Sequence, residues 1–257
     1  PALAARGLAY GAALAGRDRP GFFLAELLQA REHADGVTVL VCGRELARGL
    51  FAPPAALVGR TIVLRRESFA RWVWEKFEAF GLRRAEGAFQ AVVEAYRLDD
   101  DFQAALPRLL DEQTETLLLH ELGEWRAAQQ LEPGWAAMRL GVADRRTDLQ
   151  LAAVRDLIAD LETTLPTLLD RRDEPSLHFW FAGFDGLRAV LFPSLPAAYA
   201  QWRRSGSDRA LRAAAARGSV HFGQLAQDLL ALHAQRGDEA AVAIAARLAE
   251  PRTVCPA

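Results

Sequence analysis

The feature that most constrains the fold is a nearly continuous series of helix-length segments from Ala85 to the C-terminus. Their connections are short and carry Asp, Gly, Ser and Pro, residues that end helices and form turns. Short connections favour antiparallel neighbours in a bundle. The sequence therefore predicts a mainly α protein, a multi-helix bundle, with helices over residues 85–98, 106–131, 147–171 (kinked at Pro166), 176–192, 196–204, 208–217, 219–236 and 238–249.

The first hundred residues are predicted to form a small α/β part. Two runs rich in β-branched residues, Val37–Val41 and Thr61–Leu64, have the length and composition of strands. The segments around them are predicted to be helices: residues 2–15, 22–34, 45–51 and 67–80. We expect one compact domain over residues 1–257, with 1–100 as the α/β part and 101–257 as the bundle. The alternative is two domains that divide near residue 100.

Composition excludes several classes of protein. The chain has 257 residues, of which 51% are apolar and 25% charged, as in a globular protein. A net charge of −2 gives no basic surface for nucleic acid. No apolar run reaches the ~18 residues of a membrane span, and a cytoplasmic location is the default. Cys42 and Cys255 are too few for a disulfide scaffold or an iron–sulfur cluster, and there is no glycine-rich nucleotide loop or haem motif.

The start of the chain is also informative. Met138 is the only methionine, so we expect that the chain begins after its start codon. Either the initiator was removed before Pro1, or the chain is a fragment or a processed product.

The segment 106–131 carries the best candidate for a functional site. One stripe of this helix, with steps of three and four residues, is apolar except for Gln113, His120 and Glu124. Burying a carboxylate costs several kcal/mol unless it is paired, protonated or bound to a metal. His120 and Glu124 therefore need a partner.

The stretch His120–Glu124 is similar to the His-Glu-x-x-His helix of zinc proteases, with Glu124 in place of the second histidine. His120 and Glu124 lie one turn apart and can reach one ion, and Glu121 has the position of the general base. The alternative is that His120 and Glu124 form hydrogen bonds with each other or with neighbouring helices.

Two further histidines, His178 and His221, each precede an aspartate by seven residues, or two helical turns: Asp185 and Asp228. We expect His178 or His221 to complete the coordination of His120 and Glu124, so that the imidazoles converge on one cavity. Such nitrogen and oxygen ligands suit Zn, Mn or Fe. The alternative is separate core histidines, each satisfied by a local hydrogen bond.

Two functions follow from these patterns. The first is a metal protein with an interior His/carboxylate site, a metal-dependent hydrolase or oxidoreductase. The second is a non-enzymatic binding or assembly subunit that docks a protein partner or a small apolar ligand, with hot spots in the Trp- and Phe-rich segments 72–77 and 179–184. The sequence leaves open whether the protein is an enzyme.

Three stretches together carry a resemblance to a known family: 10–27 with Tyr10-Gly11 and Phe22-Phe23, 43–48 (Gly-Arg-Glu-Leu-Ala-Arg), and 120–124 (His-Glu-Leu-Gly-Glu). In this order they resemble a family of bacterial, mostly proteobacterial, helical proteins of unknown function. The resemblance implies a bacterial cytoplasmic protein, and members have an extra segment before the Tyr-Gly stretch. It implies no catalytic residues.

Overall fold

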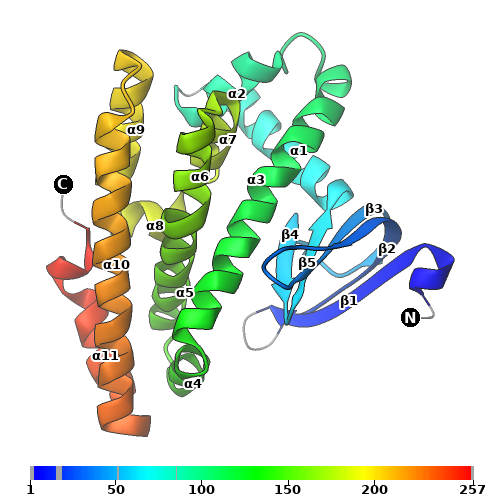
Figure 1. Ribbon diagram of the computed structural model, residues 1–257. Coiled ribbons are helices and arrows are strands. Elements are labelled where there is room, and N and C mark those ends of the chain that lie inside the picture. Colours follow the sequence, from blue (N-terminus) through cyan, green and yellow to red (C-terminus); the bar gives the residue numbers. More distant parts are fainter. Residues whose placement is uncertain (1–2, 16–18, 51, 85, 256–257) are drawn as a thin grey trace. The chain divides into compact units, whose positions relative to one another are not determined.

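The chain forms two compact units, Pro1–Leu122 and Gly123–Ala257. The computed structural model describes residues 3–15, 19–50, 52–84 and 86–255. The boundary between the units falls within the long helix α3 (Phe102–Leu131). The first unit contains the sheet, and the second is helical (Figure 1).

The sheet of the first unit has five strands in the order β1-β2-β3-β5-β4. The pairs are antiparallel except β3 with β5, which is parallel. Shifts of register interrupt the pairing of β2 with β3, and such bulges bend and twist strands. The sheet is accordingly curled into half a barrel. Its strands are β1 (Leu8–Ala15), β2 (Arg19–Glu32), β3 (Thr38–Arg48), β4 (Ala55–Val58) and β5 (Thr61–Arg65).

The prediction of a small α/β part with only two short strands is therefore wrong, although the protein is mainly α. The runs Val37–Val41 and Thr61–Leu64 do lie in strands, β3 and β5. The predicted helices over 2–15 and 22–34 instead contain β1 and β2. Ala and Leu favour helix in isolation, but strand pairing and burial override that preference. Residues 45–48, predicted to be helical, extend β3, and β4 was not predicted.

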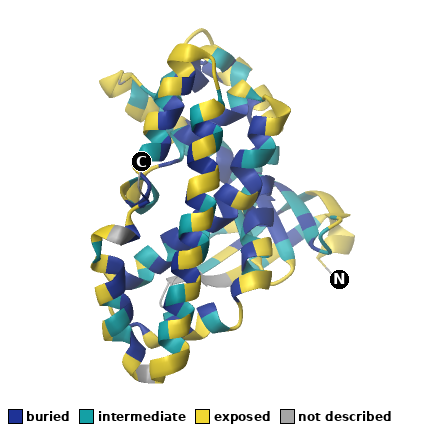
Figure 2. Cartoon of the chain, turned by 60° about the vertical axis from the view of Figure 1, so that its left-hand side comes forward, coloured by how far each residue is buried: buried dark blue, intermediate teal, exposed yellow. Residues whose placement is uncertain are grey.

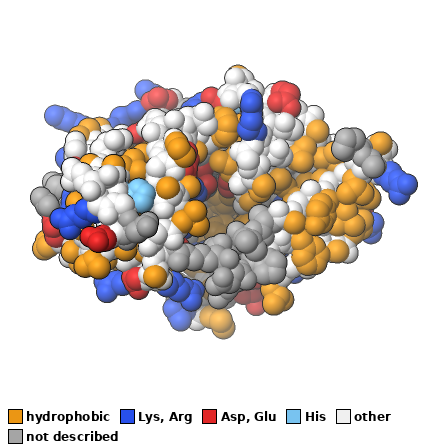
Figure 3. Space-filling view, turned by 90° about the horizontal axis from the view of Figure 1, so that it is seen from below, with side chains coloured by type: hydrophobic (Ala, Val, Ile, Leu, Met, Phe, Trp, Pro, Cys, Tyr) orange, Lys and Arg blue, Asp and Glu red, His pale blue; other side chains and the backbone are white. Residues whose placement is uncertain are grey.

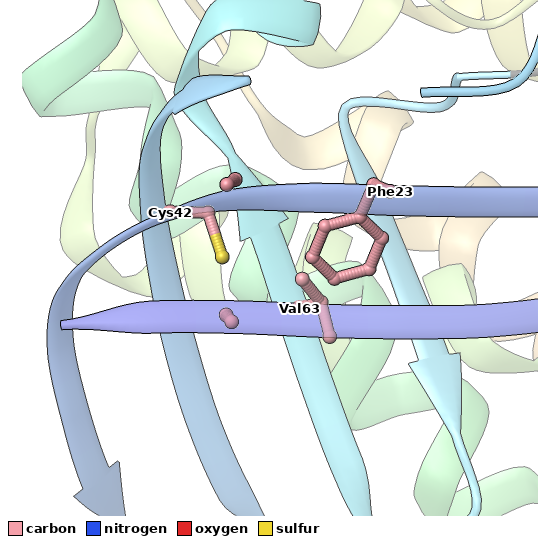
Figure 4. Close-up of a cluster of buried hydrophobic side chains, with 5 residues drawn as sticks. Phe23, Cys42 and Val63 are labelled. Atoms are coloured by element: carbon pink, nitrogen blue, oxygen red, sulfur yellow. The ribbon is translucent and has the colours of Figure 1, made fainter. Parts of the chain in front are cut away.

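The two faces of the sheet pack differently. On the convex face, Val39, Ile62 and Leu64 are buried, and helix α1 (Arg66–Arg83) packs against β3. On the concave face, alternate residues form a small apolar cluster: Ala9, Phe23, Ala25, Cys42 and Val63. Figure 4 shows Phe23, Cys42 and Val63 pointing toward one another within the curl of the sheet.

Three helices complete the first unit: α1, α2 (Ala88–Tyr96) and the first part of α3. The buried Tyr96 hydroxyl donates to Glu112 at 2.8 Å and accepts from the Gln113 amide at 2.6 Å. This network explains how Gln113 occupies an apolar stripe, since its side chain is fully buried but hydrogen-bonded.

The second unit is built from helices around α10, which contacts α5, α9 and α11. Their buried and exposed residues fall on different sides (Figure 2). The helices are α4 (Gly134–Gly141), α5 (Arg145–Ala159), α6 (Leu165–Arg171), α7 (Glu174–Ala182), α8 (Gly186–Leu191), α9 (Ser194–Ser205), α10 (Arg209–Arg236) and α11 (Ala240–Ala249). Short turns complete the two units: the π-helical turn η2 (Asp160–Thr164) and the 3-10 turns η1 (Ala4–Arg6), η3 (Gly237–Glu239) and η4 (Pro251–Thr253).

The helices predicted after residue 85 are present, with changes in their limits. The predicted helix 147–171 contains the π-helical turn η2 between α5 and α6, just before Pro166. The predicted helix 176–192 is divided into α7 and α8, whereas 208–217 and 219–236 form the single helix α10. Helix α4 was not predicted. Over the part of the chain that the structure describes, none of the helices combines the length and apolar character needed to span a membrane.

Candidate functional site

A cavity of about 440 Å³ lies in the concave side of the N-terminal sheet. Residues of all five strands line it, among them the two edge strands β1 and β4. Both edges reach one cavity because the sheet is curled. The lining is mainly apolar, and this volume is within the ~300–1,000 Å³ typical of small-molecule sites.

Small residues make room for the cavity. Gly11 of β1 lies opposite Phe23 of β2, and a Cβ atom at Gly11 would lie only 2.4 Å from the Phe23 ring. The ring therefore uses the space above Gly11. On β4 the cavity is lined by Ala56, Leu57 and Val58, and the Ala56 methyl group fills little of the space beside it.

Arg65, the last residue of β5, is the charged residue in this lining. Its side chain is 4% exposed, and it pairs with Glu45 of β3, whose side chain is 1% exposed. Arg65 Nε donates to Glu45 Oε1 at 3.1 Å, and the Ser68 hydroxyl donates to the same oxygen at 2.6 Å. The guanidinium also lies 4.9 Å from the centre of the Phe23 ring, a cation–π distance.

Arg65, Glu45 and Arg48 form a charge cluster. This charge cluster has unused hydrogen-bonding capacity and an excess of positive charge. Arg65 Nη2 lies 3.0 Å from Glu45 Oε2, yet neither atom makes a hydrogen bond to the described residues. Arg48 Nε lies 3.4 Å from the same carboxylate oxygen. Two guanidinium groups thus share one carboxylate.

Cys42 lies in the adjacent apolar cluster and is fully buried. Burial raises the pKa of its thiol to about 11, an effect that the positive charge of Arg65 partly offsets. The thiol is therefore neutral at physiological pH and acts as a small apolar side chain.

The stretch His120–Glu124 has two parts with different surroundings. His120 is half-buried and Glu121 is 5% exposed, and both belong to the first unit. Gly123 and Glu124 belong to the second unit and join α3 to α5 there. A Cβ at Gly123 would lie 2.5 Å from the Ala159 carbonyl oxygen, and Glu124 Oε2 accepts from Arg155 Nη2 at 3.0 Å.

His178 and His221 each have a partner of their own in the second unit. His178 Nδ1 lies 2.8 Å from the Tyr199 hydroxyl, in a cluster where burial raises the Tyr199 pKa to about 12. His221 Nε2 lies 3.0 Å from the Thr253 carbonyl oxygen. A carbonyl only accepts, so Nε2 carries the proton, which leaves Nδ1 as the lone-pair nitrogen of the neutral ring.

The two aspartates that follow these histidines differ: Asp228 lies on α10 with His221, whereas Asp185 does not share a helix with His178. Asp185 is exposed at the start of α8, because α7 ends at Ala182 and the expected continuous stripe is broken. Asp228 contacts Gln224 and Arg247. No three His, Cys, Asp or Glu side chains within residues 3–15, 19–50, 52–84 and 86–255 are grouped as metal ligands. The assignments of His120, Glu124, His178 and His221 as ligands and of Glu121 as base stay predictions.

The aromatic segments proposed as hot spots differ in exposure. Phe179, Trp180, Phe181 and Phe184 are buried, and the rings of Trp180, Phe181 and Phe184 pack on one another. Trp74 is 42% exposed and contacts Phe77 and Phe102. Hydrophobic side chains also gather on the right-hand side of the surface in Figure 3. Among the residues of the sheet, Tyr10, Phe22 and Val58 are exposed.

Two family models match the chain. The model of the N-terminal domain of the family of unknown function DUF6866 matches residues 1–65, and that of its C-terminal domain matches residues 70–251. The chain belongs to the DUF6866 family. This confirms the predicted membership of a family of unknown function. No curated protein and no solved structure matches the chain.

The first DUF6866 domain corresponds to the sheet, because its match ends at Arg65, where β5 ends. Sequence reasoning missed the cavity residues in this domain, since β1 and β2 were interpreted as helices. A signal was nevertheless present. Residues of the stretches 10–27 and 43–48, which carry the resemblance, meet around the cavity: Tyr10, Gly11, Phe22 and Phe23 line it, and Glu45 and Arg48 surround Arg65.

Proposed function

We propose that this DUF6866 protein is a binding protein that takes up a small apolar ligand in the concave face of its N-terminal sheet. The observation that carries the proposal is the cavity of about 440 Å³ with its mainly apolar lining. Binding sites for small molecules combine such a lining with a few placed polar groups. Here the polar group is Arg65.

The apolar side chains within the curl support the same function. Phe23, Leu40 and Val63 line the cavity, and Phe23 and Val63 belong to the apolar cluster of the concave face. An apolar ligand in contact with them would remove its own surface from water, which contributes roughly 25 cal/mol per Å² before the costs of association.

The test is binding of a neutral apolar dye, Nile red, to the purified chain and to variants that fill the cavity. Ala56→Trp places a large ring in the cavity and is expected to weaken binding at least tenfold. Ala104→Trp is the matched control, because Ala104 is exposed on α3, and it should bind as the parent does. Thr61→Phe, at a second lining position, replaces Ala56→Trp if that variant does not fold. Equal binding by parent, cavity variants and control would contradict the proposal.

A metal-dependent function is the second hypothesis, supported by the one-turn spacing of His120 and Glu124 and by the burial of Glu121. Its test is metal analysis of protein purified without a His tag. The hypothesis predicts about one Zn, Mn or Fe per chain, lost in His120→Ala. Metal content far below one per chain, unchanged by His120→Ala, would end it.

A further inference from the structure

The charge cluster at the cavity bears on the chemistry of the ligand. Arg65 is almost fully buried and lines the cavity, and its Nη2 makes no hydrogen bond to the residues that the structure describes. Nη2 lies 3.0 Å from Glu45 Oε2, an ion-pair distance, but forms no hydrogen bond with it. A ligand oxygen that accepted a hydrogen bond from this guanidinium would use that donor capacity.

The sign of the charge favours an anion. Glu45 is the carboxylate that pairs with Arg65, and it also lies within ion-pair distance of Arg48. The two guanidinium groups leave one positive charge in excess. Glu67, whose carboxylate accepts the Glu45 backbone N–H at 2.7 Å, lies 3.7 Å from Arg71, so its charge is balanced separately.

The shape of the Arg65 guanidinium further restricts the chemical class of the ligand's head group. A guanidinium is planar and presents its N–H groups as a fork that matches a carboxylate. The Arg65 guanidinium lies over the Phe23 ring, which is itself part of the apolar lining of the cavity. A head group at Arg65 and an apolar tail along Phe23, Val63 and Ala56 would use both parts of the cavity.

Building on the proposed function, we infer that the ligand is an amphipathic monoanion, a carboxylate with an apolar tail, whose head group accepts hydrogen bonds from Arg65.

The test compares three probes with the same tail and different heads: decanoate, decanol and decylammonium. Their affinities for the full chain are measured by isothermal titration calorimetry near neutral pH and below micellar concentrations. Decanoate is expected to bind about tenfold or more tighter than decanol, the ratio that corresponds to one charge-assisted hydrogen bond. Decylammonium should bind more weakly than decanol, because its charge has the same sign as the excess of the cluster.

Variants locate the head group. Arg65→Met should reduce the preference for decanoate over decanol to less than about threefold. Arg48→Met changes a side chain that is 31% exposed and should lower the preference for decanoate about threefold. This variant replaces Arg65→Met if that protein does not fold. Arg44→Met is the matched control on the same strand, because Arg44 is 70% exposed and pairs with Glu26. It should leave the preference unchanged.

The outcomes separate this inference from the proposed function. Binding of decanol as tight as that of decanoate, or a preference that survives in both Arg65→Met and Arg48→Met, overturns the monoanion and leaves the apolar cavity standing. If none of the three probes binds the parent chain, and Ala56→Trp has no effect on Nile red binding, the proposed function itself is overturned.

Discussion

Two buried ion pairs, one in each unit, have different surroundings. In the second unit, Asp160 is fully buried, and both of its carboxylate oxygens accept hydrogen bonds, from Arg188 Nη1 at 2.7 Å and from Trp180 Nε1 at 3.2 Å. In the first unit, the buried pair of Arg65 and Glu45 borders a cavity and retains atoms that make no hydrogen bond to the described residues. The first arrangement is that of a structural ion pair, and the second is the one that we propose to receive a ligand.

Architecture explains the difference. Around Asp160, helices supply side chains from several directions, and they close the space around the carboxylate. On the concave side of the curled sheet, small residues such as Gly11 and Ala56 line the cavity. The apolar cluster therefore does not fill the space inside the curl. Buried charge alone therefore does not mark a functional site. Buried charge beside an unfilled cavity is the better indicator.

The largest expected difference between the units concerns packing. Phe222 on α10 is fully buried and packs edge-on against Phe192, with ring centres 5.6 Å apart. Phe222→Ala should lower the free energy of unfolding by about 4 kcal/mol, because it leaves a closed cavity. Phe23→Ala should lower it by about 2 kcal/mol, since Phe23 already borders an open one. Urea denaturation measures both, and an equal loss would remove the contrast between the two units.

The next prediction concerns the Asp160 ion pair. Asp160→Asn keeps the shape of the side chain but leaves Arg188 without its charged partner, so we expect a loss of about 3 kcal/mol in stability. The control is Asp170→Asn, because the Asp170 side chain is 72% exposed and pairs with Arg212 at the surface. It should change stability by less than about 0.5 kcal/mol. Nile red binding should survive Asp160→Asn in folded protein, and its loss would argue that this pair takes part in ligand binding.

A smaller effect is expected at Gly123. Gly123→Ala would place a methyl group 2.5 Å from the Ala159 carbonyl oxygen and should cost about 2 kcal/mol, because backbone cannot move aside as a side chain does. Gly223→Ala on α10 is the control, since no atom outside its own helix segment lies within 4 Å of the added Cβ. It should stabilise the protein by about 1 kcal/mol. Thermal melts of the two variants should therefore shift in opposite directions, and a neutral Gly123→Ala would show that α3 and α5 can separate without cost.

The smallest effect depends on pH. Burial raises the pKa of Cys42 from 9.0 to about 11. Between these values the unfolded chain loses the thiol proton and the folded chain keeps it, so stability falls as pH rises. The expected loss is about 1 kcal/mol between pH 9 and 10. Urea denaturation at the two pH values should show this loss in the parent and a smaller one in Cys42→Ala.

Tyr199 offers the corresponding test in the second unit. Its pKa is raised from 10.0 to about 12 by burial, so Tyr199→Phe should change the pH dependence of stability only from about pH 10 upward.

For the Cys42 prediction, the contradicting outcome is a loss of stability between pH 9 and 10 that is unchanged in Cys42→Ala. The thiol would then not be buried as the structure indicates.

Sequence reasoning was most successful where local pattern and tertiary packing agree. The helices after residue 85 follow from the spacing of apolar residues and from turn residues between segments, and the strands at Val37–Val41 and Thr61–Leu64 follow from β-branched side chains. It failed for β1 and β2, whose Ala- and Leu-rich sequences favour helix. Their strand conformation is stabilised by pairing with distant partners, such as Phe23 with Arg48.

For the candidate site, the sequence by itself determined only that certain polar residues require partners. It indicated that His120 and Glu124 need them, and the structure supplies Arg155 for Glu124. It did not identify Arg65 and Glu45, which are 20 residues apart and lie on parallel strands. The cavity beside them was decided only by the tertiary structure, because it exists where five strands curl and small residues on the edge strands leave space. No local pattern encodes a space that side chains fail to fill.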